Sequence, residues 1–497
     1  MRDTVILNKP LTPFEVARVA NGATLVLSAQ AIERIKAARC LVEAIVDKGI
    51  RGYGINTGVG AFCDVIIGPA DQSALSHHIL FSHACGVGDP LPQEAARAIM
   101  AAQINNFAHG KSGISWETVE ILVALLNAGI TPVMPSQGSV GYLVHSACIG
   151  LLVIGHGEAF LDGERITGAE ALEYIGVAPR VLGAKEGLSL VNGTPCATGL
   201  ASLAFARLER LADWADAAAA FSYEMLGRQS DPFDELGLAL RLSDGVKTSA
   251  RNIRDWLAGR GQMPPEKART QDPLSLRAVP QVHGSVRDEL RHIEQVLINE
   301  LHSVTDNPVI WGTVEAPVVS SQAHAVGAAI SFAADRLALI AAQLGAISER
   351  RIDRMVNPLV SDLPAFLSAH SGRCSGLMIA QYTASALCGE NRRLSVPASL
   401  DGGVTSALQE DILTHATPAA EKALHVTHNL LYILAIELLC GAQARDLQPL
   451  PAYAPSTQRL FDRLRQDVAV YQDDRPLNRD IERVAEILDS ERAEALL

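Results

Sequence analysis

VRDELRHIEQVLINELHS, residues 286–303, is the stretch that decides the fold class. Its apolar residues step by four, three, four and four positions: Val286, Leu290, Ile293, Leu297 and Leu301. This is the spacing of one face of an α-helix, because side chains three and four residues apart lie on the same side. The stretch therefore predicts an amphipathic helix with one buried face.

Three longer segments on either side of it have the same helical character, namely residues 197–227, 323–355 and 418–445. A helix of about thirty residues is roughly 45 Å long at 1.5 Å per residue, which exceeds one globular core. Their apolar faces are broad and rich in alanine, which allows helices to approach closely. The sequence predicts a mainly α protein built on a long-helix bundle, and favours a homo-oligomer over an isolated monomeric bundle.

Composition narrows the classes of partner and compartment. The 42 Lys and Arg against 55 Asp and Glu give a net charge of −13 without a basic cluster, which argues against nucleic acid or an anionic membrane as partner. The longest apolar run, around residues 149–154, is too short to cross a bilayer, and the N-terminus lacks an export signal. Eight cysteines without any C-x-x-C pattern predict a reducing cytoplasm.

The N-terminal part of the chain is punctuated differently from the rest. GIRGYGINTGVGAF, residues 49–62, predicts a tight loop in which backbone can approach a ligand. Long helical patterns begin after about residue 113. We therefore expect an N-terminal domain over 1–113 that carries the glycine-rich loop. Residues 114–497 would form the central helical bundle and a C-terminal helical tail.

Common cofactor signatures such as a P-loop, G-x-S-x-G or H-E-x-x-H are missing from the sequence. Eight other motifs follow one another along nearly the whole chain: YGINTGVG (53–60), FSHACGVG (81–88), GSVG (138–141), KEGLSLVNGT (185–194), QDPLSLRAVPQVHG (271–284), SERRID (348–353), SGLMIAQYTASAL (375–387) and TSALQED (405–411). In order and spacing they resemble the histidine/phenylalanine ammonia-lyase family, and most of all histidine ammonia-lyase. The resemblance implies an ammonia-lyase/fumarase-like helical fold and a homotetramer whose active sites combine segments of more than one chain.

One departure from the family concerns its cofactor. In the family, GSVG is followed by Ala-Ser-Gly, which cyclises into the electrophilic methylidene-imidazolone group, MIO. Here Gly141 is followed directly by Tyr142, and three residues are missing before the register resumes. The resemblance thus implies that MIO is absent and that no cofactor replaces it. It also implies a rebuilt pocket, whose members are Gly141, Tyr142, His145, Leu274 in place of the tyrosine of QDPYSLR, and His324 in place of part of the G-N-F-H stretch.

The substrate side of the family's site is retained. By resemblance, Tyr53 is the base for the β-proton, Arg277 holds the substrate carboxylate, and Asn192 is a polar pocket residue. His83 and Glu410 match positions where histidine-specific members have partners for the imidazole. Structural alternatives remain open: Arg277 and Glu410 could belong to ion pairs, and His83 could be a hydrogen-bonded core histidine.

The histidines raise the question of a metal. His83, His145 and His324 could converge on zinc, since three imidazoles and a water suffice. Polar replacements that fill the vacated cofactor space are the reading we favour, and no metal is predicted.

Elimination without the electrophile restricts the reaction. Either the substrate carries a leaving group that needs no covalent activation, such as the quaternary ammonium of a histidine betaine, or the enzyme catalyses proton transfer or addition on a related unsaturated acid. We favour the first, with a small, amino-acid-like substrate. The alternative is an inactive homologue that binds an amino acid or regulates an active paralogue. Changes confined to the cofactor side, with the substrate side intact, favour altered catalysis.

Overall fold

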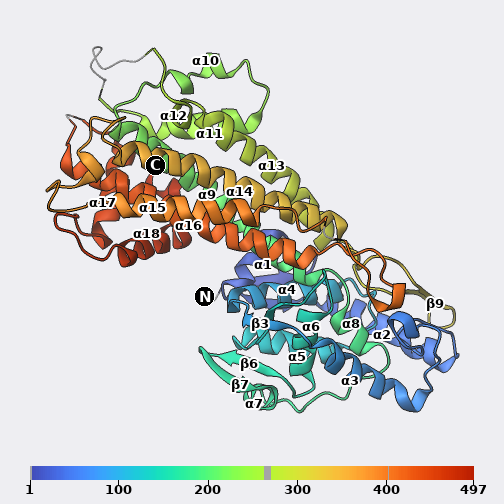
Figure 1. The fold of residues 1–497 in the computed structure, drawn as a ribbon. Coiled ribbons are helices and arrows are strands. Elements are labelled where there is room, and N and C mark those ends of the chain that lie inside the picture. Colours follow the sequence, from blue (N-terminus) through green and yellow to red (C-terminus); the bar gives the residue numbers. More distant parts are fainter. Residues whose placement is uncertain (1–2, 262–269, 401, 451) are drawn as a thin grey trace. The chain divides into compact units, whose positions relative to one another are not determined.

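The computed structural model describes residues 3–261, 270–400, 402–450 and 452–497, and the chain in it is mostly helical (Figure 1). This confirms the mainly α prediction. The chain divides into two compact units, each of which is described by itself. Unit 1 consists of Met1–Ala206, Glu294–Asp335 and Pro397–Lys422, and unit 2 of Arg207–Ile293, Arg336–Val396 and Ala423–Leu497. These units are made of separate stretches of the chain, whereas the predicted boundary at residue 113 divides the sequence at one point. That boundary stays a prediction.

Unit 1 contains short helices and small sheets. Its helices are α1 (Pro13–Ala20), α2 (Ala29–Asp47), α3 (Gln72–His83), α4 (Gln93–Ala108), α5 (Trp116–Asn127), α6 (Val144–Val153), α7 (Gly168–Tyr174) and α8 (Glu186–Val191). Its strands are β1 (Thr4–Leu7), β2 (Thr24–Leu27), β3 (Val87–Pro90), β4 (Thr131–Pro132), β5 (Pro135–Gln137), β6 (Glu158–Leu161), β7 (Glu164–Thr167), β8 (Val309–Gly312) and β9 (Pro317–Ser320). They pair as a parallel β1–β2, an antiparallel β3–β5, a β4–β6–β7 sheet and an antiparallel β8–β9.

Unit 2 is helical in its described part. Its own helices are α10 (Glu235–Leu238), α11 (Asp244–Leu257), α12 (Leu274–Arg277), α15 (Met378–Leu394), α17 (Pro455–Asp467) and α18 (Asn478–Ser490). Trp214, Trp256 and Tyr223 are among the largest fully buried side chains. Large aromatic rings contribute much buried apolar area per residue, so they stabilise this core although aromatic residues are few.

Four long helices have residues in both units: α9 (Pro195–Met225), α13 (Val279–Leu301), α14 (Ala328–Val356) and α16 (Ala416–Leu447). They confirm the four predicted segments. Helix α13 starts seven residues earlier than predicted because Pro280 stands at its second position, where a missing N–H is tolerated. Its five predicted core positions are at most 2% exposed. Pro418, expected at the first helical position of α16, is the third residue of the helix.

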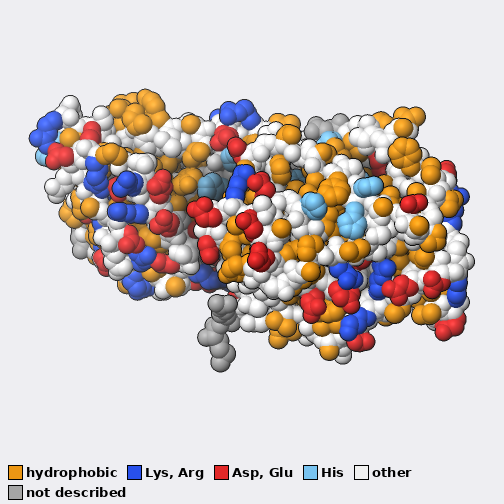
Figure 2. Space-filling model, turned by 90° about the horizontal axis from the view of Figure 1, so that it is seen from below, with side chains coloured by type: hydrophobic (Ala, Val, Ile, Leu, Met, Phe, Trp, Pro, Cys, Tyr) orange, Lys and Arg blue, Asp and Glu red, His pale blue; other side chains and the backbone are white. Residues whose placement is uncertain are grey.

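Two of these helices, α14 and α16, are long and apolar enough to cross a membrane by length and composition alone. Of their most apolar windows, 61% and 83% of the residues are buried inside the protein, as is usual for core helices. Acidic and basic side chains are interspersed over the face shown in Figure 2.

Candidate active site

The glycine-rich loop carries Tyr53 and is anchored by the core of unit 1. Ile55, fully buried, packs with apolar residues of α2 and with Ile310 of β8. Gly54 has φ +62°, and a Cβ there would lie 2.2 Å from Leu188. Only glycine combines that conformation with so close an approach. The loop prediction for residues 49–62 is confirmed, apart from a single 3-10 turn over Gly60–Phe62.

The Tyr53 hydroxyl accepts a hydrogen bond from the Gly60 backbone N–H at 2.8 Å. Burial raises the pKa of Tyr53 above its usual value, the Gly60 bond opposes this, and the negative charge of Glu410 raises the pKa further. A donor at the phenol oxygen favours the phenolate, whereas desolvation and a neighbouring anion disfavour it. Tyr53 is therefore protonated in the free protein near neutral pH.

The segment around Gly141 is fixed to the start of α16. His415 N donates to Val140 O at 2.9 Å, and Thr417 Oγ1 donates to Gly141 O at 2.9 Å. Gly141 has φ +140°. Residues 138–142 consequently have little freedom to move away from that helix end.

Leu143, at the start of α6, has a strained backbone. Its φ and ψ are 77° and −65°, and Val144 N donates to Tyr142 O at 3.1 Å. Together these define a γ-turn of the rare positive-φ kind. A branched side chain rarely adopts this conformation, whose cost is of order 1–3 kcal/mol and is often found at functional sites.

Tyr142, next to this turn, reaches a second loop. Its hydroxyl donates to Oε2 of Glu410 at 2.9 Å. Burial raises the pKa of Tyr142, and the charge of Glu410 and the proximity of Tyr53 add to the effect. Glu410 lies in the TSALQED loop, whose Ser406 is so near Gly60 that a Cβ on Gly60 would lie 2.6 Å from Ser406 Oγ. The structure thus brings together Tyr53, Tyr142 and Glu410, from three separate motifs.

His83 is the last residue of α3. Its Nδ1 lies 2.7 Å from Ile79 O, so Nδ1 carries the proton and donates to that carbonyl. Burial lowers the pKa of His83, which keeps the imidazole neutral. Nε2 then carries the lone pair. Strand β3, which follows, pairs with β5, and β5 leads into residues 138–142.

Asn192 belongs to a buried network that the prediction did not contain. Its Nδ2 donates to Oδ1 of Asp306 at 3.0 Å and to Asn307 O at 2.6 Å. Lys185, completely buried, donates to Oδ2 of Asp306 at 2.8 Å. Lys185 is the first residue of the KEGLSLVNGT motif. A lysine inside an apolar run needs a buried acidic partner, so the sequence contained a signal for the ion pair with Asp306. The network holds Asn192 in place by its amide nitrogen.

His145 and His324 occupy different environments. His145 is fully buried, and its Nε2 lies 3.4 Å from Oε1 of Glu421. His324 is exposed. Within the described residues no group of three or more His, Cys, Asp and Glu is arranged to hold a metal ion, so the three histidines considered for zinc do not converge there.

The remaining two predicted residues, Leu274 and Arg277, belong to unit 2, on helix α12. They line one cavity of about 530 Å³, together with Asp231, Pro232, Ala278 and Gln281. The Arg277 Nε is buried without a hydrogen-bond partner among the described residues. A guanidinium that lines a cavity is suited to an anion, and its planar fork matches a carboxylate. The carboxylate-binding role of Arg277 stays a prediction.

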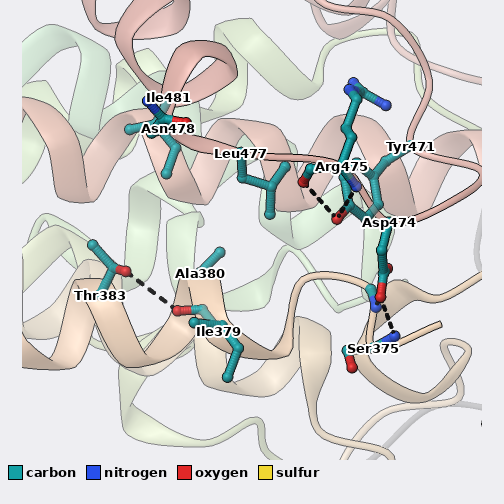
Figure 3. Close-up of a pocket in the computed structure, with 11 residues that line it drawn as sticks. Ser375, Ile379, Ala380, Thr383, Tyr471, Asp474, Arg475, Leu477, Asn478 and Ile481 are labelled. Carbon is teal, nitrogen blue, oxygen red and sulfur yellow. Dashed lines mark hydrogen bonds between the residues drawn. The ribbon is translucent and has the colours of Figure 1, made fainter.

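Unit 2 contains a second cavity of about 550 Å³, between the start of α15 and residues 471–481 (Figure 3). Its two charged side chains, Asp474 and Arg475, already bind within the protein. Asp474 accepts from the backbone N–H groups of Ser375 and Gly376 at 2.7 and 3.0 Å, and Arg475 pairs with Asp480 at 2.8 Å. Thus the carboxylate-binding role fits the Arg277 cavity better than this one.

Comparisons with known proteins show which family the chain belongs to. The Aromatic amino acid lyase family matches residues 11–466. The chain is 44% identical to a histidine ammonia-lyase from Symbiobacterium thermophilum over 98% of this chain and 96% of that protein. Among solved structures, it is similar to histidine ammonia-lyase from Trypanosoma cruzi, at 36% identity and a TM-score of 0.91 over 100% of this chain and 95% of that one.

A further solved structure is the ergothioneine-degrading enzyme ergothionase from Treponema denticola, in complex with desmethyl-ergothioneine sulfonic acid. Identity is 28% with a TM-score of 0.90, and all of both chains is covered. With the retained motifs, the helical fold and these matches in agreement, the chain belongs to the aromatic amino acid lyase family.

Proposed function

We propose that this protein is a histidine ammonia-lyase-type carbon–nitrogen lyase that works without MIO, on a histidine derivative whose α-nitrogen is a quaternary ammonium and leaves as a tertiary amine. An ammonia-lyase type of enzyme is supported by the relatives. The observation that supports the finer proposal is the hydrogen bond between Tyr142 and Glu410, because Tyr142 follows directly on Gly141, where the resemblance implies the family's electrophile.

The residues present do not fit the family's cofactor. MIO needs a serine followed by glycine next to Gly141, and the residues there are Tyr142, Leu143 and Val144. The nearest serines are otherwise engaged: Ser139 Oγ accepts from Gly141 N at 3.1 Å, and Ser146 Oγ lies 3.2 Å from Cys196 Sγ inside α6. The proposed reaction therefore does not involve that group.

The chain's own groups supply the rest of an elimination. Tyr53, as phenolate, takes the β-proton of the substrate, and the C–H electron pair forms the Cα=Cβ bond. The Cα–N bond breaks, and its pair leaves with nitrogen as a neutral tertiary amine. A quaternary ammonium needs no proton and no covalent activation to leave in this way, and it has no N–H that could be lost to the base instead of the carbon proton.

Recognition of the remaining substrate is assigned to residues that already have the right chemistry. The Nε2 lone pair of neutral His83 can accept a hydrogen bond from the N–H of a substrate imidazole. Glu410 binds Tyr142 through Oε2, and its Oε1 has no hydrogen-bond partner within the described residues, so Oε1 can also accept from the imidazole. Arg277 would bind the carboxylate, and Asn192 stays a polar pocket residue. The similarity to the ergothioneine-degrading enzyme from Treponema denticola supports a substrate other than histidine itself.

The assembly and compartment are part of the proposal. By resemblance to the family, the protein would be a homotetramer in the cytoplasm, without a nucleic acid or membrane partner. Light scattering on the purified protein would test the tetramer, which a monomeric mass would contradict.

The test of the function is a substrate panel on the purified protein: histidine, its mono-, di- and trimethylated forms at the α-nitrogen, and phenylalanine. Amine release and the near-ultraviolet absorption of an unsaturated acid are followed, with Tyr53→Phe as the inactive control. We expect turnover of the trimethylated form, and an intact mass equal to the sequence mass without loss of water. Binding without turnover across the panel would instead support the inactive, amino-acid-binding homologue. A dehydrated peptide at 138–146 would contradict independence of MIO.

A further inference from the structure

The three side chains that meet in unit 1 form a site with a particular charge. Glu410 is an acid, and it is flanked by the phenols of Tyr142 and Tyr53. The negative charge of Glu410 raises the pKa of both phenols. Tyr142 is only 9% exposed, so its ring is largely shielded from water. The site is therefore aromatic and anionic, and the Tyr142 ring is its most buried part.

We propose that Tyr142, held by Glu410 and next to Tyr53, is the specificity-determining residue that receives the quaternary ammonium of the substrate on its ring. This deepens the function proposed above and rests on it. A tyrosine ring attracts a cation through its quadrupole, and the attraction is largest where the ring is desolvated. Aromatic side chains are the usual receptors for quaternary ammonium groups in proteins.

The geometry selects a quaternary over a primary ammonium. A primary ammonium brings three N–H donors, each of which needs an acceptor when it is buried. In this cluster Oε2 of Glu410 is already bound by Tyr142, the Tyr53 oxygen is bound by Gly60 N, and the other Glu410 oxygen is assigned above to the substrate imidazole. A quaternary ammonium has no donor to satisfy and needs only rings and a nearby negative charge. The tyrosine that fills the place of the electrophile thus also disfavours unmethylated substrate.

Such a bound cation would also act on the base. In the free protein, burial and Glu410 raise the pKa of Tyr53. A fixed positive charge beside the phenol favours the phenolate and lowers that pKa. The substrate thereby helps to deprotonate the residue that attacks it, and the base is activated only when the correct leaving group is in place.

The test compares two ligands that differ in one atom. Trimethylated histidine is compared with its neutral isostere, in which a tert-butyl group replaces the trimethylammonium. Their affinities are measured by calorimetry on wild type, Tyr142→Phe and Tyr142→Leu. Tyr174→Leu, an exposed tyrosine in the same unit, serves as the control. Tyr53→Phe in every background prevents turnover during the measurement.

We expect the ratio of the two affinities to fall about 10- to 30-fold in Tyr142→Leu, and to stay within about threefold in Tyr142→Phe and Tyr174→Leu. A Tyr142→Leu variant that keeps the wild-type ratio overturns the inference. So does an equal loss in Tyr142→Phe, because the hydroxyl and not the ring would then matter. The affinity ratio does not depend on catalysis. Lack of amine release from every substrate would therefore count against the proposed function alone.

The pH profile gives a second, independent readout. The acid limb of kcat/KM reports the free enzyme and that of kcat reports the substrate complex. For trimethylated histidine we expect the limb of kcat to lie at least about one pH unit below that of kcat/KM. Coincident limbs would contradict activation of Tyr53 by the substrate.

Discussion

Replacement of Glu421 by glutamine should change how the stability of the protein depends on pH. Burial raises the pKa of the Glu421 carboxyl to about 8, and burial lowers the pKa of His145, whose Nε2 lies 3.4 Å away, to about 4. Between these values both groups are neutral, so a protonated carboxyl faces a neutral imidazole. The pair joins α6 to α16 directly behind the segment that carries Tyr142.

Glu421 and His145 change the free energy of unfolding in opposite directions as the pH rises. A raised folded-state pKa means that the stability contributed by Glu421 is complete below the unfolded value of 4.5 and is lost as the pH rises through 8. For His145 the lowered pKa gives stability that is present above 6.5 and lost as the pH falls towards 4. The two largely offset each other from pH 4.5 to 6.5. From 6.5 to 8 only Glu421 acts.

The magnitude follows from that window. One pKa unit is about 1.4 kcal/mol, so a window of about 1.5 units gives about 2 kcal/mol at most. Glu421 is 24% exposed, and solvent screening brings the expected loss to about 1–2 kcal/mol. For a chain of this length this is a shift of roughly 1–2 °C in the unfolding temperature.

The assay is thermal unfolding at pH 6.5 and 8.5 of wild type, Glu421→Gln and the control Glu164→Gln, an exposed glutamate. We expect the unfolding temperature to fall less between pH 6.5 and pH 8.5 in Glu421→Gln than in wild type and in the control. Infrared difference spectra should show a protonated carboxyl at pH 7 in wild type and not in Glu421→Gln. Parallel pH dependence of all three proteins, or no such band, would refute the reasoning.

Three further changes test other parts of the structure. Leu143→Gly should raise the unfolding temperature, because it removes about 1–3 kcal/mol of backbone strain and costs about 0.5–1 kcal/mol in the entropy of the unfolded chain. The control Leu477→Gly, at a helix start with φ −89°, should lower the unfolding temperature. A lower unfolding temperature in both variants would contradict strain at Leu143. Lys185→Met leaves Asp306 buried and unpaired, and should lower the free energy of unfolding in urea by roughly 3–5 kcal/mol; unchanged stability would exclude the pair as a structural element. Arg277→Lys keeps the charge but loses the planar fork, and should lower kcat/KM by about tenfold or more, chiefly through KM; unchanged kinetics would remove Arg277 from the site.

Much of the fold could be predicted because it depends on periodicity. The face of α13 from Val286 to Leu301 is buried as its spacing indicates, since apolar residues on one side of a helix have to be covered. Helix ends were less accurate. Position 418 was expected to open α16, but proline is tolerated anywhere in the first turn, and so it does not mark the first residue.

The candidate site was predictable only in part. Tyr53 and Glu410 were identified from their motifs, but their proximity to Tyr142 depends on how three loops meet, and no local pattern contains that. The role of Asp306 was missed because an acid followed by Asn-Pro reads as an ordinary turn. Only its pairing with a buried lysine gives it a structural role.

The tethered segment before α6 limits any attempt to insert Ala-Ser-Gly after Gly141 by engineering. Val140 and Gly141 are fastened to the beginning of α16, and α6 begins two residues after Tyr142. An Ala-Ser-Gly graft would add up to about 10 Å of chain with both of its ends fixed, so the inserted residues would have to enter the volume of the tyrosine ring. A successful graft should therefore require deletion of Tyr142. Ring closure in a variant that keeps Tyr142 would be seen as loss of water in the intact mass. That result would show that the hydrogen bonds of Val140 and Gly141 to the start of α16 can break.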